Sequence, residues 1–272
     1  MIPASFERFV DSYGKKVGQA AMWIILLLLW IPIGIVTLMS FAPDRALAFP
    51  PDGVTLYWYS TFLRNDSAIT AVLMSVQISL IATLITVVLA TALAYGIAKY
   101  DFPGKELLQI VVTLPIIVPL VVVGVALVLF FGTIGIGTGF WSVVIAHVIR
   151  TIPFAALIII PTMLRFDERL EEAAKDLGAD ELDAFINVRL PNTLPGIVAG
   201  GLLAFTISFN EFVYTYFVRD TQTETLPVYL WNQIRFEATP EVNVISVVFL
   251  FVAVLMILIA MALTNVRRIT MR

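Results

Sequence analysis

Six apolar segments, each about as long as a bilayer is thick, constrain the fold of this chain most strongly. A hydrocarbon core of about 30 Å is crossed by roughly 20 consecutive apolar residues in an α-helix. Segments of this kind occupy residues 20–42, 68–98, 107–131, 139–163, 195–218 and 243–264. The sequence therefore predicts an all-α integral membrane protein with six transmembrane helices.

The composition fits a chain that has the bilayer as its solvent. Of the 272 residues, 60% are hydrophobic and 14% are charged, and the mean hydropathy is +0.94. A soluble domain carries about 25% charged residues. The first apolar segment continues past the length of a signal peptide and has no small-residue cleavage site. We therefore expect it to be retained as the first membrane helix.

The distribution of Lys and Arg predicts the orientation of the helices. These residues concentrate in the N-terminal segment, the 99–106 and 164–194 loops and the C-terminus. The loops on the other side carry only Arg45, Arg64, Arg219 and Arg235. Because cytoplasmic loops are rich in Lys and Arg, we expect both termini in the cytoplasm. The expected parts are a cytoplasmic segment at 1–19, a transmembrane domain at 20–264 and a cytoplasmic tail at 265–272.

Several classes of function find no support in the sequence. The net charge of −3 gives no reason to expect a nucleic-acid partner. With no cysteine and one histidine, the chain is poorly equipped for a metal site or for nucleophilic catalysis. Gly14-Lys15 and Gly104-Lys105 lack the upstream glycine and the following hydroxyl of a phosphate-binding loop. We expect neither an enzyme nor a chain that binds a cofactor, a metal or ATP.

The 164–194 loop has the pattern of two short helices. Helix-forming residues dominate 168–177, and Gly178 follows where a helix ends in a left-handed residue. A second helical stretch covers about 180–188, and Pro191 is expected to end it. One face of the first helix is formed by Leu170, Ala173, Ala174 and Leu177. From physics alone, we expect this face to pack on the chain's own helix bundle.

The same loop also resembles a known motif. Glu172-Ala173-Ala174 is followed after three residues by Gly178, and nine residues later by Val188-Arg189-Leu190-Pro191. This spacing resembles the EAA loop of ABC importer permeases, with Val188 where isoleucine is usual. The turn Phe102-Pro103-Gly104-Lys105 and the prolines at 115 and 119 are also similar to features of that family.

The resemblance implies a type I, MetI-like permease fold in a bacterial inner membrane. In that family the EAA loop forms a coupling helix in a groove of the ATPase subunit. The implied coupling residues are Glu172, Ala173, Ala174, Gly178, Leu190 and Pro191. The implied partners are a second, homologous permease, two ATP-binding subunits that carry ATP and Mg, an outer solute-binding protein, and membrane lipid.

Polar side chains within the spans are candidates for the translocation path, because they are costly in a bilayer. The fifth span contains Asn210 and Glu211, which either line a path that meets a cation or hold the bundle together through interhelical hydrogen bonds. Tyr214 is either an interface anchor or a ligand contact. Gln77 faces the path or bonds across helices. In the fourth span we expect His147 and Arg150 to pack structurally, and Arg150 could pair with Glu211.

The segment Ser208-Phe209-Asn210-Glu211-Phe212 resembles the spermidine/putrescine branch of these permeases, which often has two acids there. Asn210 replaces one acid and halves the negative charge. We expect a polyamine permease. The alternatives are a permease for a phosphonate, an opine, ferric iron or sulfate, and a secondary transporter driven by an ion gradient. A secondary transporter should show inverted repeats, and no internal repeat is evident.

Overall fold

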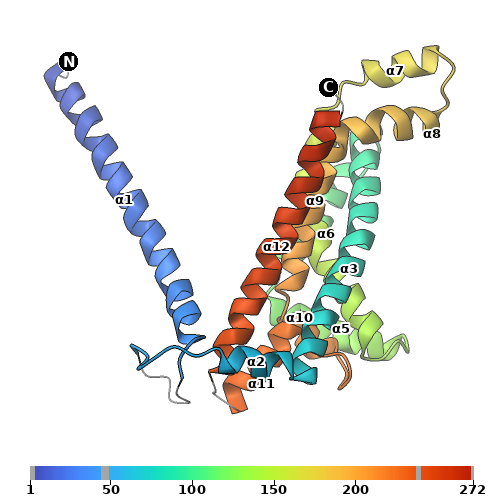
Figure 1. Ribbon diagram of the computed structural model, residues 1–272. Coiled ribbons are helices and arrows are strands. Elements are labelled where there is room, and N and C mark those ends of the chain that lie inside the picture. Colours follow the sequence, from blue (N-terminus) through green and yellow to red (C-terminus); the bar gives the residue numbers. More distant parts are fainter. Residues whose placement is uncertain (1–3, 44–48, 237–239, 271–272) are drawn as a thin grey trace. The chain divides into compact units, whose positions relative to one another are not determined.

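The computed structural model describes residues 4–43, 49–236 and 240–270, and within 4–13 and 259–270 it describes the backbone alone. The described chain is helical and contains no strand, so the predicted all-α class is confirmed. The helices are α1 (Ala4–Met39), α2 (Tyr57–Leu63), α3 (Asp66–Lys99), α4 (Lys105–Ile117), α5 (Leu120–Thr133), α6 (Phe140–Leu164), α7 (Arg169–Asp176), α8 (Glu181–Ala184), the π-helical η1 (Phe185–Arg189), α9 (Leu190–Phe209), α10 (Val213–Val218), α11 (Leu226–Phe236) and α12 (Glu241–Thr270) (Figure 1).

The membrane-spanning helices agree with the predicted segments. Within the described ranges, five helices are long and apolar enough to cross a bilayer, and the bent pair of α4 and α5 makes a sixth when it is counted as one span. The helix of α1 begins inside the predicted N-terminal segment, and α12 continues into the predicted tail. Leu28 and Leu29 on α1 are each 63% exposed. Such apolar surface is stable where lipid or another membrane protein covers it.

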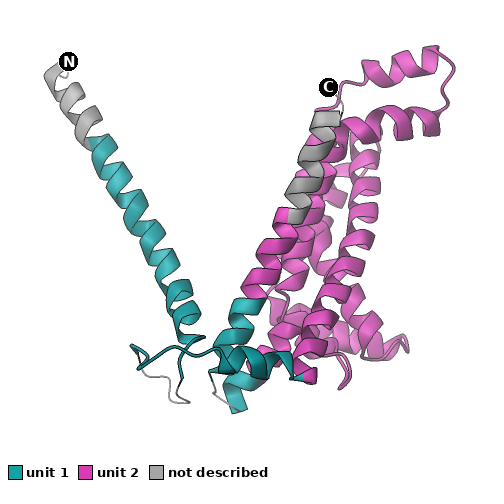
Figure 2. Ribbon diagram, in the orientation of Figure 1, with its two compact units in different colours: residues 1–65, 233–248 teal, residues 66–232, 249–272 magenta. Residues whose placement is uncertain are grey.

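Three helices form the centre of the larger compact unit, which comprises residues 66–232 and 249–272 (Figure 2). α3, α6 and α9 pack on one another along their lengths. Small side chains allow this close approach, because Ala90, Ala155 and Ala204 are completely buried. A Cβ atom on Gly200 would lie 2.8 Å from Cγ1 of Ile159, so a larger residue would push α9 away from α6.

The third predicted span, 107–131, is bent. α4 and α5 meet at an angle of 106°. Val118 between them is extended, with φ −72° and ψ 134°, as expected for a residue before a proline. Pro119 has no N–H with which to continue the helix of α4. The sequence pattern located this span, and Pro119 explains why it breaks, whereas α4 continues through Pro115 to Ile117.

The second loop helix continues into the fifth span, so the prediction that Pro191 ends it is wrong. α8, η1 and α9 follow one another without interruption from Glu181 to Phe209. In the π-helical turn the N–H of Leu190 donates to the carbonyl of Phe185, five residues earlier. The wider turn changes the hydrogen-bond register just before Pro191. The proline therefore stands at the start of an α-helical segment, where its missing N–H is tolerated.

The fifth predicted span, 195–218, consists of two helices. α9 ends at Phe209, and α10 begins at Val213 after a break at residues 210–212. Discontinuous spans of this kind leave backbone groups free to meet solutes in transporters. The break therefore places the polar residues of this span at the end of one helix and the beginning of another.

The smaller compact unit comprises residues 1–65 and 233–248 (Figure 2). Within this unit, α2 is tied to the segment that follows α1. The indole Nε1 of Trp58 donates to the carbonyl of Ala42 at 3.1 Å, and Trp58 is buried. This hydrogen bond satisfies the polar end of a buried tryptophan.

Candidate functional site

The 164–194 loop folds into a hairpin of two helices, α7 and α8, at one end of the larger unit (Figure 1). Gly178 has a φ of +97°, in the left-handed region that favours glycine. The N–H of Ala179 donates to the carbonyl of Ala174 at 3.1 Å, and the N–H of Gly178 donates to that of Lys175 at 2.9 Å. This pair of bonds is the Schellman arrangement that ends many helices. The predicted helix end is confirmed.

The apolar face of the hairpin is exposed, so the prediction that it packs on the chain's own bundle is wrong. Leu177 is 91% exposed and Leu182 is 64% exposed. Glu172 and Ala173 are exposed beside them. On the side of the membrane that the Lys and Arg distribution predicts to be cytoplasmic, exposed apolar side chains have no lipid to cover them. Such a surface is a candidate for contact with another protein.

The other predicted coupling residues divide between this surface and the root of the hairpin. Gly178 is exposed and Ala174 is half-buried. Leu190 packs against the core formed by α3, α6 and α9, and Pro191 is half-buried beside it. The exposed surface therefore contains Glu172, Ala173 and Gly178, whereas Leu190 and Pro191 connect the hairpin to the fifth span.

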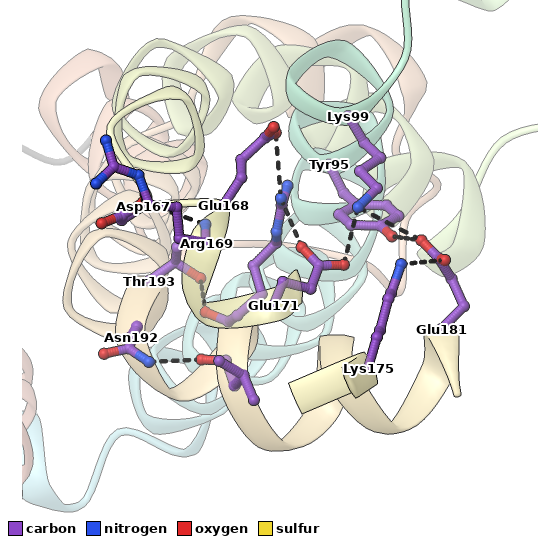
Figure 3. A network of polar contacts seen from close by, with 12 residues as sticks. Tyr95, Lys99, Asp167, Glu168, Arg169, Glu171, Lys175, Glu181, Asn192 and Thr193 are labelled. Carbon is purple, nitrogen blue, oxygen red and sulfur yellow. Dashed lines mark hydrogen bonds and ion pairs between the residues drawn. The ribbon is translucent and has the colours of Figure 1, made fainter. Parts of the chain in front are cut away.

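A buried ion pair that the sequence pattern does not predict anchors the hairpin. Nη2 of Arg189 lies 2.7 Å from Oε2 of Glu171, and each side chain is 1% exposed. Nζ of Lys99, at the end of α3, donates to Oε1 of Glu171 at 3.0 Å (Figure 3). The guanidinium of Arg189 also lies over the rings of Tyr95 and Phe166, 5.2 and 4.8 Å from their centres. Breaking a buried pair of this kind costs about 3–5 kcal/mol.

A second, exposed ion pair closes the hairpin. Nζ of Lys175 donates to Oε2 of Glu181 at 2.6 Å, and the two side chains are 33% and 53% exposed (Figure 3). This hydrogen bond raises the pKa of the Lys175 ammonium above its ordinary value. The hydroxyl of Tyr95 donates to the other oxygen of Glu181 at 3.1 Å. α3 therefore contacts the acidic member of each ion pair, because Lys99 bonds to Glu171 and Tyr95 bonds to Glu181.

The break in the fifth span forms the second candidate site. A pocket of about 320 Å³ lies there, lined by Leu120, Arg150, Thr206, Ile207, Asn210, Glu211, Phe212 and Val213. Oε2 of Glu211 is 3.4 Å from Nε of Arg150, which is the ion pair that the sequence suggested. Oε1 accepts a hydrogen bond from the N–H of Tyr214 at 2.9 Å. The carboxylate thus holds a basic side chain and the start of α10 together.

The structure brings only part of the predicted path residues to this pocket. Asn210 is exposed there, and its Nδ2 donates to the carbonyl of Thr206 at 2.7 Å. Tyr214 is completely buried in the hydrophobic core and does not line the pocket. Gln77 is exposed on α3 and is also absent from the pocket lining. Asn210 and Glu211 therefore share a site with Arg150, and Tyr214 and Gln77 do not.

His147 joins the helices on either side of the break. Its Nδ1 lies 2.8 Å from Oγ of Ser208 on α9, and its Nε2 lies 2.7 Å from Oγ1 of Thr215 on α10. The imidazole is 1% exposed. It therefore has the packing role that the sequence analysis expected. In the described ranges no group of His, Cys, Asp or Glu residues could hold a metal ion.

Comparison with known proteins identifies the family. Residues 86–269 match the family described as "Binding-protein-dependent transport system inner membrane component". This chain belongs to that family. The permease is 32% identical over 247 residues to the spermidine/putrescine transport system permease protein PotC of Haemophilus influenzae, covering 91% of this chain and 96% of that protein. It is 31% identical over 238 residues to the putrescine transport system permease protein PotI of Escherichia coli K12, covering 84% of each.

A solved structure supports the same architecture. The permease matches a chain of a bacterial alginate ABC transporter in complex with an alginate pentasaccharide-bound periplasmic protein, with a TM-score of 0.74 over 97% of each chain. At 15% identity this likeness shows the fold alone. The predicted family and permease fold are confirmed, and the protein is a multi-pass ABC importer permease. The family assignment leaves the alternative of a secondary transporter without support.

Proposed function

We propose that this permease forms half of the translocation path of a polyamine importer, and that its α7–α8 hairpin docks on a separate ATP-binding subunit. The observation that carries the proposal is the exposed surface of Glu172, Ala173 and Leu177 on that hairpin. A left-handed Gly178 and a buried ion pair hold this surface in one pose before any partner binds. A preorganised surface loses little conformational entropy on docking.

The proposed complex contains more than one chain. A second permease, homologous but different, completes the path, and two ATP-binding subunits carry ATP and Mg. A solute-binding protein delivers the solute to the outer side. The permease itself then binds no cofactor and hydrolyses nothing. Its place is a bacterial inner membrane with both termini in the cytoplasm, which the Lys and Arg distribution favours.

The proposed substrate follows from Glu211 and from the relatives named for spermidine and putrescine transport. A carboxylate in a pocket within a membrane span attracts an ammonium group. In this chain Arg150 already pairs with that carboxylate. The ring of Phe154 lies 4.9 Å from the guanidinium carbon and gives Arg150 a second favourable contact. An incoming amine can therefore compete with Arg150 for Glu211, because Arg150 keeps its contact with the ring of Phe154.

One observation favours a second candidate function. The pocket presents a guanidinium as well as a carboxylate, so a solute with an anionic group would find a partner in Arg150. A phosphonate, an opine or sulfate would use this contact. Ferric iron would instead need Glu211. The same transport assay distinguishes these solutes from polyamines.

The test is solute-stimulated ATP hydrolysis by the reconstituted importer. The permease is co-expressed with its neighbouring permease and ATP-binding subunit, purified, and placed in liposomes with the binding protein. Spermidine, putrescine, a phosphonate, an opine, ferric iron and sulfate are then compared. Stimulation by a polyamine supports the proposal. Stimulation by another solute overturns the substrate only, and the absence of any stimulation overturns the proposed assembly.

A variant of the hairpin tests the docking surface in the same assay. Gly178→Arg places a long side chain at a left-handed residue on the exposed surface, so stimulation should be lost. Asp101→Arg adds the same side chain to an exposed position in another predicted cytoplasmic turn and should leave stimulation intact. Equal activity of the two variants would show that the hairpin does not couple ATP hydrolysis to transport.

A further inference from the structure

The buried ionic cluster at the root of the hairpin joins three segments that are distant in sequence. Glu171 lies on α7, Arg189 ends the π-helical turn that leads into α9, and Lys99 ends α3. Both oxygens of the Glu171 carboxylate are engaged, one by Arg189 at 2.7 Å and the other by Lys99 at 3.0 Å. A movement of α7 therefore acts directly on the ends of two membrane spans.

The surroundings of Arg189 make this connection stiff. Its side chain is 1% exposed and lies over the rings of Tyr95 and Phe166. Within the described part of the chain, its Nε and Nη1 have no hydrogen-bond partner. The positive charge of Arg189 is therefore balanced mainly by the carboxylate of Glu171. The carboxylate of Glu168 is farther away, at 3.5 Å. A buried charge that loses its partner is strongly disfavoured, so the pair resists separation.

The far end of α9 reaches the pocket, where Thr206 and Ile207 line it. α9 is continuous from the hairpin to the break at Asn210, and α3 packs along both α6 and α9. Arg150 of the pocket lies on α6. Packed helices thus connect Glu171 to the ion pair of Arg150 and Glu211. Energetic coupling between two distant sites needs a structural element with two arrangements, and events at either site must shift the equilibrium between them.

We propose that Glu171 and Arg189 are positioning residues that transmit movement of the hairpin to the α9 span, with Lys99 extending the connection to α3. The inference rests on the proposed function, because it supposes that an ATP-binding subunit moves the hairpin. The exposed pair of Lys175 and Glu181 differs in kind. Water screens it, and exposed pairs contribute little rigidity.

The experiment compares transport with ATP hydrolysis in the reconstituted complex. Glu171→Gln removes the charge of the carboxylate and keeps its shape. The double variant Glu171→Gln with Arg189→Gln removes both charges, so no buried charge is left unpaired. We expect both variants to assemble and to hydrolyse ATP. The solute transported for each ATP hydrolysed should fall by about tenfold, within the range for residues that carry coupling.

The double variant separates transmission from simple charge balance. If it restores the wild-type ratio of transport to hydrolysis, the defect of the single variant came from an unpaired charge and the proposal is overturned. A wild-type ratio in Glu171→Gln also overturns it. Loss of assembly in both variants overturns it too, because the pair would then serve folding. If only the single variant fails to assemble, the ratio of transport to hydrolysis in the double variant tests the proposal. A reduced ratio supports it, and a wild-type ratio overturns it.

A matched control uses another acid on the predicted cytoplasmic side. Asp101→Asn breaks the pair with Lys105 at 2.9 Å, in which the aspartate is completely exposed. This variant should keep the wild-type ratio, and a loss as large as that of Glu171→Gln would contradict a specific role for the buried pair. Failure of the proposed function appears separately, because a wild-type complex that transports no solute gives no ratio to compare.

Discussion

Glu211 and Arg150 face one another at the break in the fifth span, with Oε2 of the carboxylate 3.4 Å from Nε of the guanidinium. The two side chains are 5% and 16% exposed, so the pair is formed at the edge of a pocket. In the described part of the chain, Nε of Arg150 makes no hydrogen bond. The contact of Nε with the carboxylate is thus an ion pair without a hydrogen bond.

Replacement of Glu211 by Gln should weaken the binding of a polyamine during transport. A charge-assisted hydrogen bond contributes about 1.5–3 kcal/mol, so the spermidine concentration for half-maximal transport should rise by about tenfold or more. Initial uptake rates measured against spermidine concentration give this value. Gln77→Ala is the control, because Gln77 is exposed on α3 away from the pocket. An unchanged value for the Glu211 variant would remove this residue from the path.

Replacement of Leu177 by Asp should weaken docking of the ATP-binding subunit. Leu177 is 91% exposed, so the permease itself should remain folded. Loss of an apolar contact at the centre of an interface costs about 2 kcal/mol, and the dissociation constant should rise by roughly tenfold or more. Binding of the subunit to the solubilised permease pair measures this change. Val54→Asp, at an exposed position outside the hairpin, should bind like wild type.

Replacement of Gly178 by Ala should destabilise the end of α7. A side chain in the left-handed conformation costs about 1–2 kcal/mol. Hydrogen exchange of the α7 amides should therefore become faster, while exchange in α3 stays the same. Gly96→Ala is the opposite control, because Gly96 lies within α3 and has no neighbouring atom within 4 Å of a Cβ. That variant should not accelerate exchange. Slow exchange of α7 in the Gly178 variant would contradict the left-handed turn.

Replacement of His147 by Ala should lower stability without changing the use of solute. The imidazole bonds to the hydroxyls of Ser208 and Thr215. Its loss removes the His147 partner of the buried Ser208 hydroxyl, whereas Thr215 keeps its hydrogen bond to the carbonyl of Glu211 at 3.3 Å. An unpaired buried group costs about 1–3 kcal/mol. The unfolding temperature of the purified complex should fall. If stability is unchanged and the half-maximal concentration shifts instead, His147 belongs to the path.

Much of the fold follows from the sequence because the bilayer demands it. Apolar length predicts the spans, and the glycine at 178 predicts the end of α7, both from local rules. The continuity of α8 with α9 does not follow from such rules. Pro191 normally ends a helix, and only the π-helical turn before it makes the continuation possible. The angle between α4 and α5 likewise depends on packing around Pro119.

The candidate sites follow from the sequence only in part. The pairing of Glu211 with Arg150 could be predicted from the sequence, because ionised side chains within a bilayer pair with opposite charges. The sequence could not predict the burial of Tyr214 or the exposure of Gln77. A helix that is apolar on all sides does not reveal which of its faces is buried. Glu171 and Glu172 are neighbours of the same type. Which of them is buried depends on the position of Arg189, which the π-helical turn determines.

The central claim is that this permease imports a polyamine when a partner hydrolyses ATP, and uptake of labelled spermidine into proteoliposomes tests it most directly. The liposomes contain the permease pair with its ATP-binding subunits, with the binding protein on the outside and nucleotide on the inside. The account predicts accumulation with ATP, none with a non-hydrolysable analogue, and none with Gly178→Arg. Accumulation that does not depend on ATP, or an absence of uptake while another solute is imported, would contradict it.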